Sequence, residues 1–288
     1  MFFSAIIAGF FAGFSPFWGL LIIIAYGFRH YQKNSAAYFG TFAVAAITSV
    51  FLFTVGSHSL ALMDAFLGIG FTVWLFFYYL SNSQNLQKAF LIASGNGFLY
   101  GFLRQYLFRQ VINDQIIASS SQSLGLMREL FSNNPEMQSL LEQSAQTSLS
   151  FFQKYGTSIW FVVIFFALYL GSLWLAGRNK ISWKQDAFFL PYWSVYLLIT
   201  AMLFFLFPLT RITGSNLLMI ILPYFLIQGI AVFFYFWKYY TSNKKFILFF
   251  LISCLLLNYV FFLFLIFLGI ADLWLLFRQK HQEKIKPL

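Results

Sequence analysis

Long apolar blocks alternate with short polar stretches along the chain. The blocks are about 17 residues or longer, which matches the thickness of the hydrocarbon core of a bilayer. Residues 159–175 and 246–276 have almost no polar face, whereas an element of a soluble protein places polar residues on the face that meets water. Membrane β-strands are about 10 residues long and alternate in polarity. The pattern therefore predicts an all-α, polytopic transmembrane helical bundle, in which backbone groups pair within each helix.

The blocks predict about eight spans. They cover residues 2–27, 36–55, 60–80, 88–108, 157–176, 188–207, 215–239 and 246–277. Pro16 and Gly19 lie in the middle of the first block, so it is either two short helices or one kinked helix. The last block would be roughly 48 Å long as one helix. We expect it to tilt, to protrude or to break, with the break near Asn258.

Residues 109–154 have a different character. Charged residues, serines and glutamines separate two groups of apolar residues at helical spacing, which are Leu124, Met127, Leu130 and Phe131, and then Met137, Leu140 and Leu141. This spacing predicts two amphipathic helices, separated near residues 132–135, that lie on the membrane surface or cap the bundle. The chain thus divides into N-terminal transmembrane helices (1–108), extramembrane amphipathic helices (109–154), and C-terminal transmembrane helices with a basic tail (155–288).

The formal net charge of +10 indicates topology rather than nucleic-acid binding. The basic residues lie mostly in short loops and in the tail, as expected for loops on the cytoplasmic side of a membrane. An unbroken last block would leave equal numbers of basic residues on the two sides. A helical hairpin in that block would move the basic tail to one side and make that side clearly richer. We therefore expect a broken last block and a cytoplasmic C-terminus.

The sequence lacks the common catalytic motifs. It has no glycine-rich phosphate loop that ends in Lys-Ser or Lys-Thr, and no His-Glu-x-x-His. The three histidines lie at the ends of predicted spans or in the tail, and the single cysteine, Cys254, lies inside an apolar block. We expect no enzymatic activity, no ATPase, no metal site and no cofactor.

Four polar residues in or beside the predicted spans form a candidate pocket. Asp64 lies near the start of the third span, and Asn96, Arg104 and Arg109 lie in or just after the fourth. Ionisable residues inside spans are candidates for function, because a charge in lipid is costly. These residues could line a polar pocket under the amphipathic segment. The alternatives are an interfacial carboxylate at a helix start for Asp64, and arginines that reach toward the headgroups.

Asp272 and Arg278 lie six residues apart in the last block. On one continuous helix they would be roughly 120° apart around the axis, so we expect no direct ion pair between them. The expected role is that of an anchor at the membrane interface.

Small residues repeat at four-residue spacing in the first block, as Ala5, Gly9 and Gly13. Such a stripe lets helix backbones approach closely. It could serve packing inside the protein or contact with another membrane subunit.

Four local patterns resemble those of the YybS-like family of bacterial multi-pass membrane proteins. They are YGFRH at residues 26–30, the segment from Trp183 to Leu190-Pro191, YFLIQGIAV at residues 224–232, and LGIADLW at residues 268–274 followed by Phe277-Arg278. The membrane core of that family is similar to the substrate-binding subunits of energy-coupling-factor transporters. This likeness implies a ligand pocket and partner subunits.

Two functional hypotheses follow. The first is a substrate-binding or transport-associated membrane protein without its own ATPase. The alternative is a structural or assembly factor of the cell envelope with no small-molecule ligand. Both hypotheses place the chain in the lipid bilayer, with other membrane subunits as candidate partners. Neither includes nucleic-acid binding.

Overall fold

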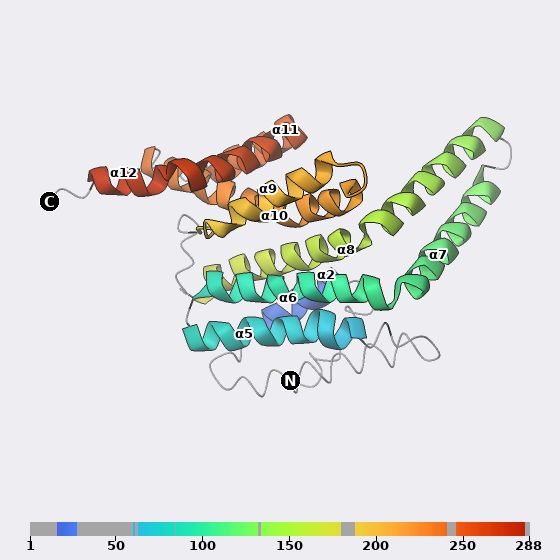
Figure 1. Ribbon diagram of the computed structural model, residues 1–288, viewed down its shortest axis with the longest axis horizontal. Helices are drawn as coiled ribbons and strands as arrows, with labels where there is room; N and C mark the ends of the chain where they lie inside the picture. Colours follow the sequence, from blue (N-terminus) through green and yellow to red (C-terminus); the bar gives the residue numbers. More distant parts are fainter. Residues whose placement is uncertain are drawn as a thin grey trace. The chain divides into compact units, whose positions relative to one another are not determined.

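The computed structural model describes residues 16–27, 60, 63–83, 85–131, 134–179, 188–240 and 246–285. These residues form helices and no strand (Figure 1), which confirms the predicted all-α class. The chain divides into two compact units, Met1–Ile181 and Ser182–Leu288. The predicted span at residues 36–55 and the stripe of Ala5, Gly9 and Gly13 lie outside the described residues.

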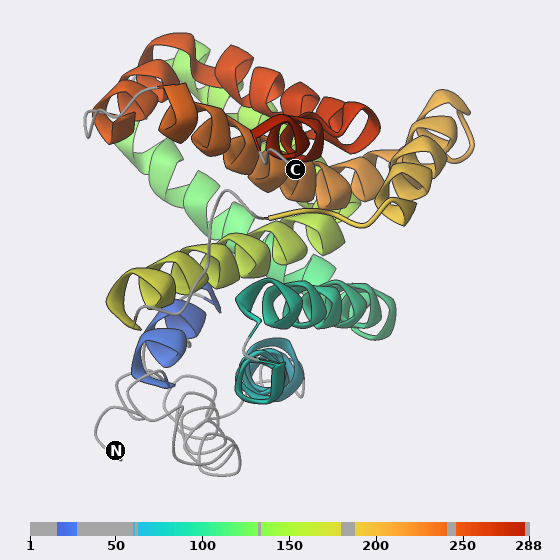
Figure 2. The ribbon, with the colours of Figure 1, turned by 90° about the vertical axis from the view of Figure 1, so that its left-hand side faces the viewer.

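The described part of the first unit contains five helices and one π-helix. They are α2 (Pro16–Gly27), the π-helix η2 (Asp64–Phe71), α5 (Thr72–Ser83), α6 (Leu86–Leu107), α7 (Arg109–Leu130) and α8 (Pro135–Asn179). The helix α8 packs against α2, α6 and α7, and α5 packs against α6 (Figure 2). Fully buried aromatic rings fill the contact between α6 and α8, where Phe90 meets Phe165 edge to face with ring centroids 5.1 Å apart.

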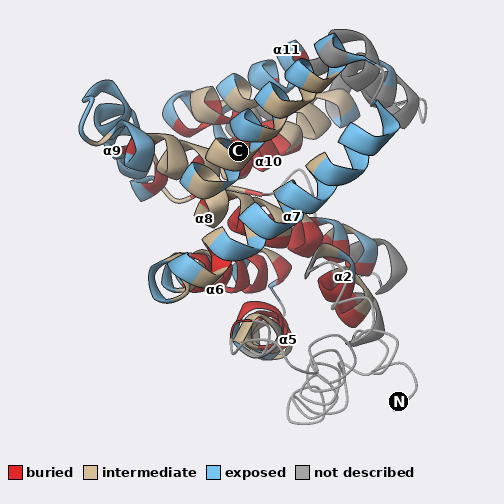
Figure 3. Ribbon diagram, turned by 90° about the vertical axis from the view of Figure 1, so that its right-hand side faces the viewer, coloured by how far each residue is buried: buried red, intermediate tan, exposed pale blue. Residues whose placement is uncertain are grey.

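The amphipathic spacing predicts two helices, and the structure has two there, α7 and the N-terminal part of α8, which pack against each other as a hairpin. The connection between them lies at residues 131–134, where Asn134 Oδ1 accepts a hydrogen bond from the backbone N–H of Met137 at 3.1 Å and Pro135 takes the first helical position. The N-terminal half of α8 and α7 are both mostly exposed (Figure 3). With 45 residues, α8 is about 68 Å long. It runs without a break through the predicted boundary between residues 154 and 155.

The second unit contains α9 (Trp193–Leu206), α10 (Arg211–Tyr240), α11 (Phe246–Leu275) and α12 (Phe277–Ile285). The helix α10 packs against both α9 and α11. Two glycines allow the backbones of α10 and α11 to touch. A Cβ added at Gly229 would overlap the carbonyl oxygen of Leu265, and one added at Gly269 would overlap that of Phe225. No residue with a side chain fits at either position without moving the helices apart.

The last apolar block does not break near Asn258, so that expectation is wrong. The helix α11 is continuous from Phe246 to Leu275, and the chain turns at Leu276, which has a backbone φ of 51°. The block contains no proline and no glycine before Gly269, so nothing near Asn258 removes or weakens a helical hydrogen bond. After the turn, α12 lies against α10, where the hydroxyl of Tyr235 is 3.0 Å from Nδ1 of His281.

Among the described residues, two helices are long and apolar enough to cross a bilayer. They are Glu136–Leu175 within α8 and Arg211–Lys238 within α10. The helix α9 and the segment Tyr259–Leu275 are apolar but shorter. The number of about eight spans therefore stays a prediction.

Candidate functional site

An ion pair joins η2 to the end of α6 in the first unit. Oδ1 of Asp64 accepts a hydrogen bond from Nε of Arg104 at 2.8 Å, and Oδ2 accepts one from Nη2 at 3.0 Å. Tyr100, one turn earlier on α6, donates its hydroxyl to Oδ1 at 2.6 Å. The side chains of Arg104 and Asp64 are only 17% and 19% exposed. The bidentate geometry and the third donor hold the carboxylate in one orientation and balance its charge.

Local backbone geometry brings this carboxylate to α6. Asp64 is the first residue of the π-helix, a rare conformation that occurs frequently at functional sites. Gly68, in the same element, packs directly on two aromatic rings. A Cβ there would lie 2.7 Å from Cε1 of Tyr100 and 2.8 Å from Cζ2 of Trp160. The glycine therefore lets η2 lie close enough for Asp64 to reach Arg104.

The guanidinium of Arg104 also stacks on α8. Its central carbon lies 4.7 Å from the ring centroid of Trp160, within the range of a cation–π contact. Trp160 is 8% exposed, and its Nε1 makes no hydrogen bond within the described residues, nor does the buried Oε1 of Gln105. Buried polar atoms are normally paired, so these two atoms are unusual features of the contact between α6 and α8.

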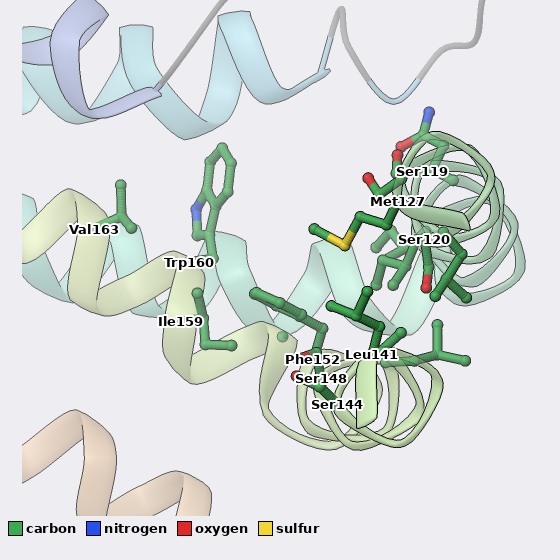
Figure 4. A pocket seen from close by; sticks show the side chains of 18 of the residues that line it. Ser119, Ser120, Met127, Leu141, Ser144, Ser148, Phe152, Ile159, Trp160 and Val163 are labelled. Atoms are coloured by element: carbon green, nitrogen blue, oxygen red, sulfur yellow. The ribbon is translucent and has the colours of Figure 1, made fainter. Parts of the chain in front are cut away.

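A groove lies between α7 and the N-terminal half of α8 (Figure 4). Arg104 and Trp160 are among its lining residues. Its volume is about 750 Å³, which falls in the range of small-molecule sites, about 300–1,000 Å³. The lining is mostly apolar, and Arg104 is its one charged side chain. Serine hydroxyls come from both helices: Ser119, Ser120 and Ser123 from α7, and Ser144 and Ser148 from α8.

The serines of the groove differ from three other serines of the same helices. Ser121, Ser139 and Ser150 each donate to a carbonyl of their own helix at 2.8–2.9 Å. The five groove serines make no such bond, nor any other hydrogen bond to the part of the chain that the structure describes. Their hydroxyls are thus available as donors and acceptors to water or to a ligand.

The structure brings together two of the four residues of the predicted pocket. Asp64 and Arg104 form the ion pair, and Arg104 also lines the groove. Asn96 lies two turns from Arg104 on α6 and donates to Oγ1 of Thr72 at 2.9 Å, outside the groove. Arg109 is exposed at the start of α7 and does not line the groove.

A second polar cluster is buried in the second unit. Oδ2 of Asp272 accepts hydrogen bonds from Nη2 of Arg278 at 2.7 Å, from Nε of the same residue at 3.0 Å, and from Nε2 of Gln228 at 3.3 Å. Oε1 of Gln228 accepts from the backbone N–H of Leu190 at 3.0 Å. Asp272 and Gln228 are fully buried, and Arg278 is 4% exposed. The cluster ties α10, α11 and α12 to the segment that precedes α9.

The expectation of no ion pair between Asp272 and Arg278 is therefore wrong. It assumed one continuous helix, but the turn at Leu276 returns Arg278 to the end of α11. The sequence offers little signal for this turn, because leucine rarely adopts positive φ. Gln228, a polar residue in the middle of an apolar block, was the available signal. Three of the four segments that resemble the YybS-like family supply the residues of this cluster, which are Leu190, Gln228, Asp272 and Arg278.

The comparisons with known proteins give one family. The family described as Predicted membrane protein (DUF2232) matches residues 3–273. No curated protein and no solved structure matches the chain.

Proposed function

The chain belongs to this family of predicted membrane proteins, and we propose that it is a multi-pass protein of the bacterial cytoplasmic membrane that binds a small molecule in the groove between α7 and α8. In this proposal it is a substrate-binding or transport-associated component without its own ATPase. Its role is binding rather than catalysis, because the ionisable groups at the groove are held in the pair of Asp64 and Arg104.

Exposed apolar surface supports the placement in a membrane. On α9 and the following turn, Tyr196 is 71% exposed, Leu206 72% and Leu209 101%. The exposed apolar side chains of α11 include Phe262, Phe264 and Phe267. A soluble monomer rarely exposes contiguous apolar surface of this kind. In a bilayer, lipid chains would cover this surface and keep its apolar side chains away from water.

The observation that carries the binding role is the groove itself. It combines the volume of a small-molecule site with a mostly apolar lining, and its few polar groups come from three helices. Ligand sites in proteins share these properties. The hydroxyls of the five groove serines make no hydrogen bond to the described residues, so they are available to a ligand.

A pair of alanine substitutions tests the binding role. Ala145 lines the groove, whereas Ala118 is exposed on α7 outside it. We expect Ala145→Trp to fill the groove and Ala118→Trp to leave it open. A panel of polar and amphipathic metabolites is screened by thermal shift on the purified full chain. A ligand at 100 times its Kd stabilises a protein by about 2.7 kcal/mol.

The expected result is a compound that raises the Tm of the wild type and of Ala118→Trp but not that of Ala145→Trp. A compound that stabilises all three proteins equally would place its site elsewhere. That result would remove the groove from the proposal.

A further inference from the structure

The groove carries almost no net charge. Arg104 is the one charged side chain of its lining, and Asp64 neutralises it through two hydrogen bonds of 2.8 and 3.0 Å. Within the described residues, the second terminal nitrogen of Arg104, Nη1, makes no hydrogen bond. This amino group is available to an oxygen atom of a ligand.

An anionic ligand gains little at this position. The guanidinium attracts it, but the carboxylate of Asp64, held against Nε and Nη2 of the same guanidinium, repels it. The two Coulomb interactions have opposite sign, so the repulsion offsets part of the attraction. An anion would still lose its hydration on entering an apolar groove, which is costly without a compensating charge. An uncharged oxygen-bearing group avoids that cost and still accepts a hydrogen bond from Nη1.

The rest of the lining suits an apolar chain. Apolar side chains face the groove from both helices, with Met127 on α7 and Leu141 and Phe152 on α8 (Figure 4). The volume of about 750 Å³ lies within the range of sites for drug-sized molecules, about 300–1,000 Å³. A molecule with one acyl chain and a small head group has this size, whereas a two-chain phospholipid is larger.

We infer that the groove takes an uncharged amphipathic molecule with a single apolar chain, and that Asp64 sets this selectivity by neutralising Arg104. The inference rests on the proposed function, since it names the class of molecule bound at the same site. The hydroxyl and ester oxygens of the head group bind Arg104 and serines of the groove. The apolar chain runs along Leu141 and Met127.

Two photoreactive probes with the same acyl chain test the inference. One is 1-monopalmitoylglycerol and the other is palmitate, each with a diazirine at the end of the chain. They are offered to the purified full chain at alkaline pH, where the palmitate carboxyl is ionised, and labelled residues are located by mass spectrometry. We expect the neutral probe to label the groove near Met127 and Leu141 about tenfold more than palmitate.

Substitution of Asp64 separates selectivity from structure. Asp64→Asn keeps one acceptor oxygen for Tyr100 and Nε of Arg104, replaces the acceptor of Nη2 with an NH2 group, and leaves the charge of Arg104 unbalanced, so palmitate labelling should rise about tenfold. The double variant Asp64→Asn/Arg104→Gln removes both charges and should restore the preference for the neutral probe. Glu142→Gln is the matched control, because Glu142 pairs with Arg128 at 2.6 Å on the same hairpin outside the groove lining.

The outcomes separate two claims: that the groove binds a ligand, and that it selects an uncharged molecule with one apolar chain. Equal labelling of the wild type by both probes, or an Asp64→Asn variant with unchanged preference, would overturn the inference and leave a ligand groove in place. Labelling of the groove by a two-chain phospholipid probe as strong as that by monopalmitoylglycerol would also overturn it. Failure of all probes to label groove residues in the wild type would count against the inference and the proposed function together.

Discussion

At the residue scale, two carboxylate–arginine pairs illustrate how burial decides the contribution of a charge. The pair of Asp272 and Arg278 has side chains that are 0% and 5% exposed, whereas the pair of Glu142 and Arg128 has side chains that are 45% and 59% exposed. Water screens the second pair and competes for its hydrogen bonds. In the first pair, each charge depends on the other, because both have lost their hydration.

This contrast predicts different costs for the same substitution. Arg278→Met leaves the carboxylate of Asp272 buried without a counter-charge, and we expect it to lower the free energy of unfolding by about 3–5 kcal/mol. Arg128→Met removes an exposed partner and should cost less than about 1 kcal/mol. The measurement is thermal or denaturant unfolding of the purified proteins in the same detergent. Equal stability of the two variants would contradict the buried ion pair.

One of the two largely buried ion pairs could be predicted from the sequence, and the other could not. Asp64 and Arg104 stand out as ionisable residues in apolar blocks, and the structure pairs them. The partners of Asp272 do not stand out, because the pairing depends on a leucine with a φ of 51°. A glycine at position 276 would have indicated a helix end. The groove serines were not identified either, since serine at a helix surface is common and only the facing helix makes it part of a site.

At the element scale, the contact between α10 and α11 depends on glycine. Gly229→Ala places a Cβ into the carbonyl group of Leu265, which belongs to backbone and cannot rotate away. The helices must separate, and we expect a loss of stability of about 1–3 kcal/mol or more. Gly125→Ala, in the exposed part of α7 with no atom within 4 Å of the new Cβ, should stabilise by up to about 1 kcal/mol.

Unfolding of both variants in detergent checks this prediction. The control separates the effect of close packing from the general helix preference for alanine over glycine. If Gly229→Ala gains stability as Gly125→Ala does, α10 and α11 do not touch along their backbones.

Elements are also where the sequence predicts the fold best. The amphipathic period of residues 109–154 predicts α7 and the first turns of α8, with their connection in the right place. What the period does not reveal is that α8 continues into the next apolar block, because a change in polarity along a helix does not break its backbone hydrogen bonds. The length of the last apolar block suggested a break at Asn258, yet α11 remains one helix of 30 residues. The length of an apolar helix relative to the thickness of the bilayer constrains how far the helix tilts or protrudes. A break in the helix requires a local cause.

At the scale of the whole molecule, the two units carry different features. The first unit holds the groove and the pair of Asp64 and Arg104, and the second holds the buried cluster of Gln228, Asp272 and Arg278. Three of the segments that resemble the YybS-like family meet in that cluster. The resemblance therefore corresponds to packing in the second unit, and it gives no information on what the groove binds.

The turn at Leu276 leads to a prediction about topology. Because α12 contacts Tyr235 and Phe236, near the C-terminal end of α10, we expect the basic tail to lie on the same side of the membrane as residues 241–245. That arrangement places Lys244, Lys245 and the basic residues of the tail together in the cytoplasm, as the distribution of positive charge favours. Leu209, in the turn before α10, should then lie on the opposite side.

Single cysteines test this arrangement in a Cys254→Ala background, which removes the chain's one native thiol. Leu209→Cys should react with a membrane-impermeant maleimide added outside intact cells, because Leu209 is 101% exposed and lies at the other end of α10. Ser242→Cys and a cysteine added after Leu288 should react only after the membrane is permeabilised. Labelling of the C-terminal cysteine from outside, with Ser242→Cys protected, would mean that α11 and α12 together cross the bilayer and that α12 does not fold back onto α10.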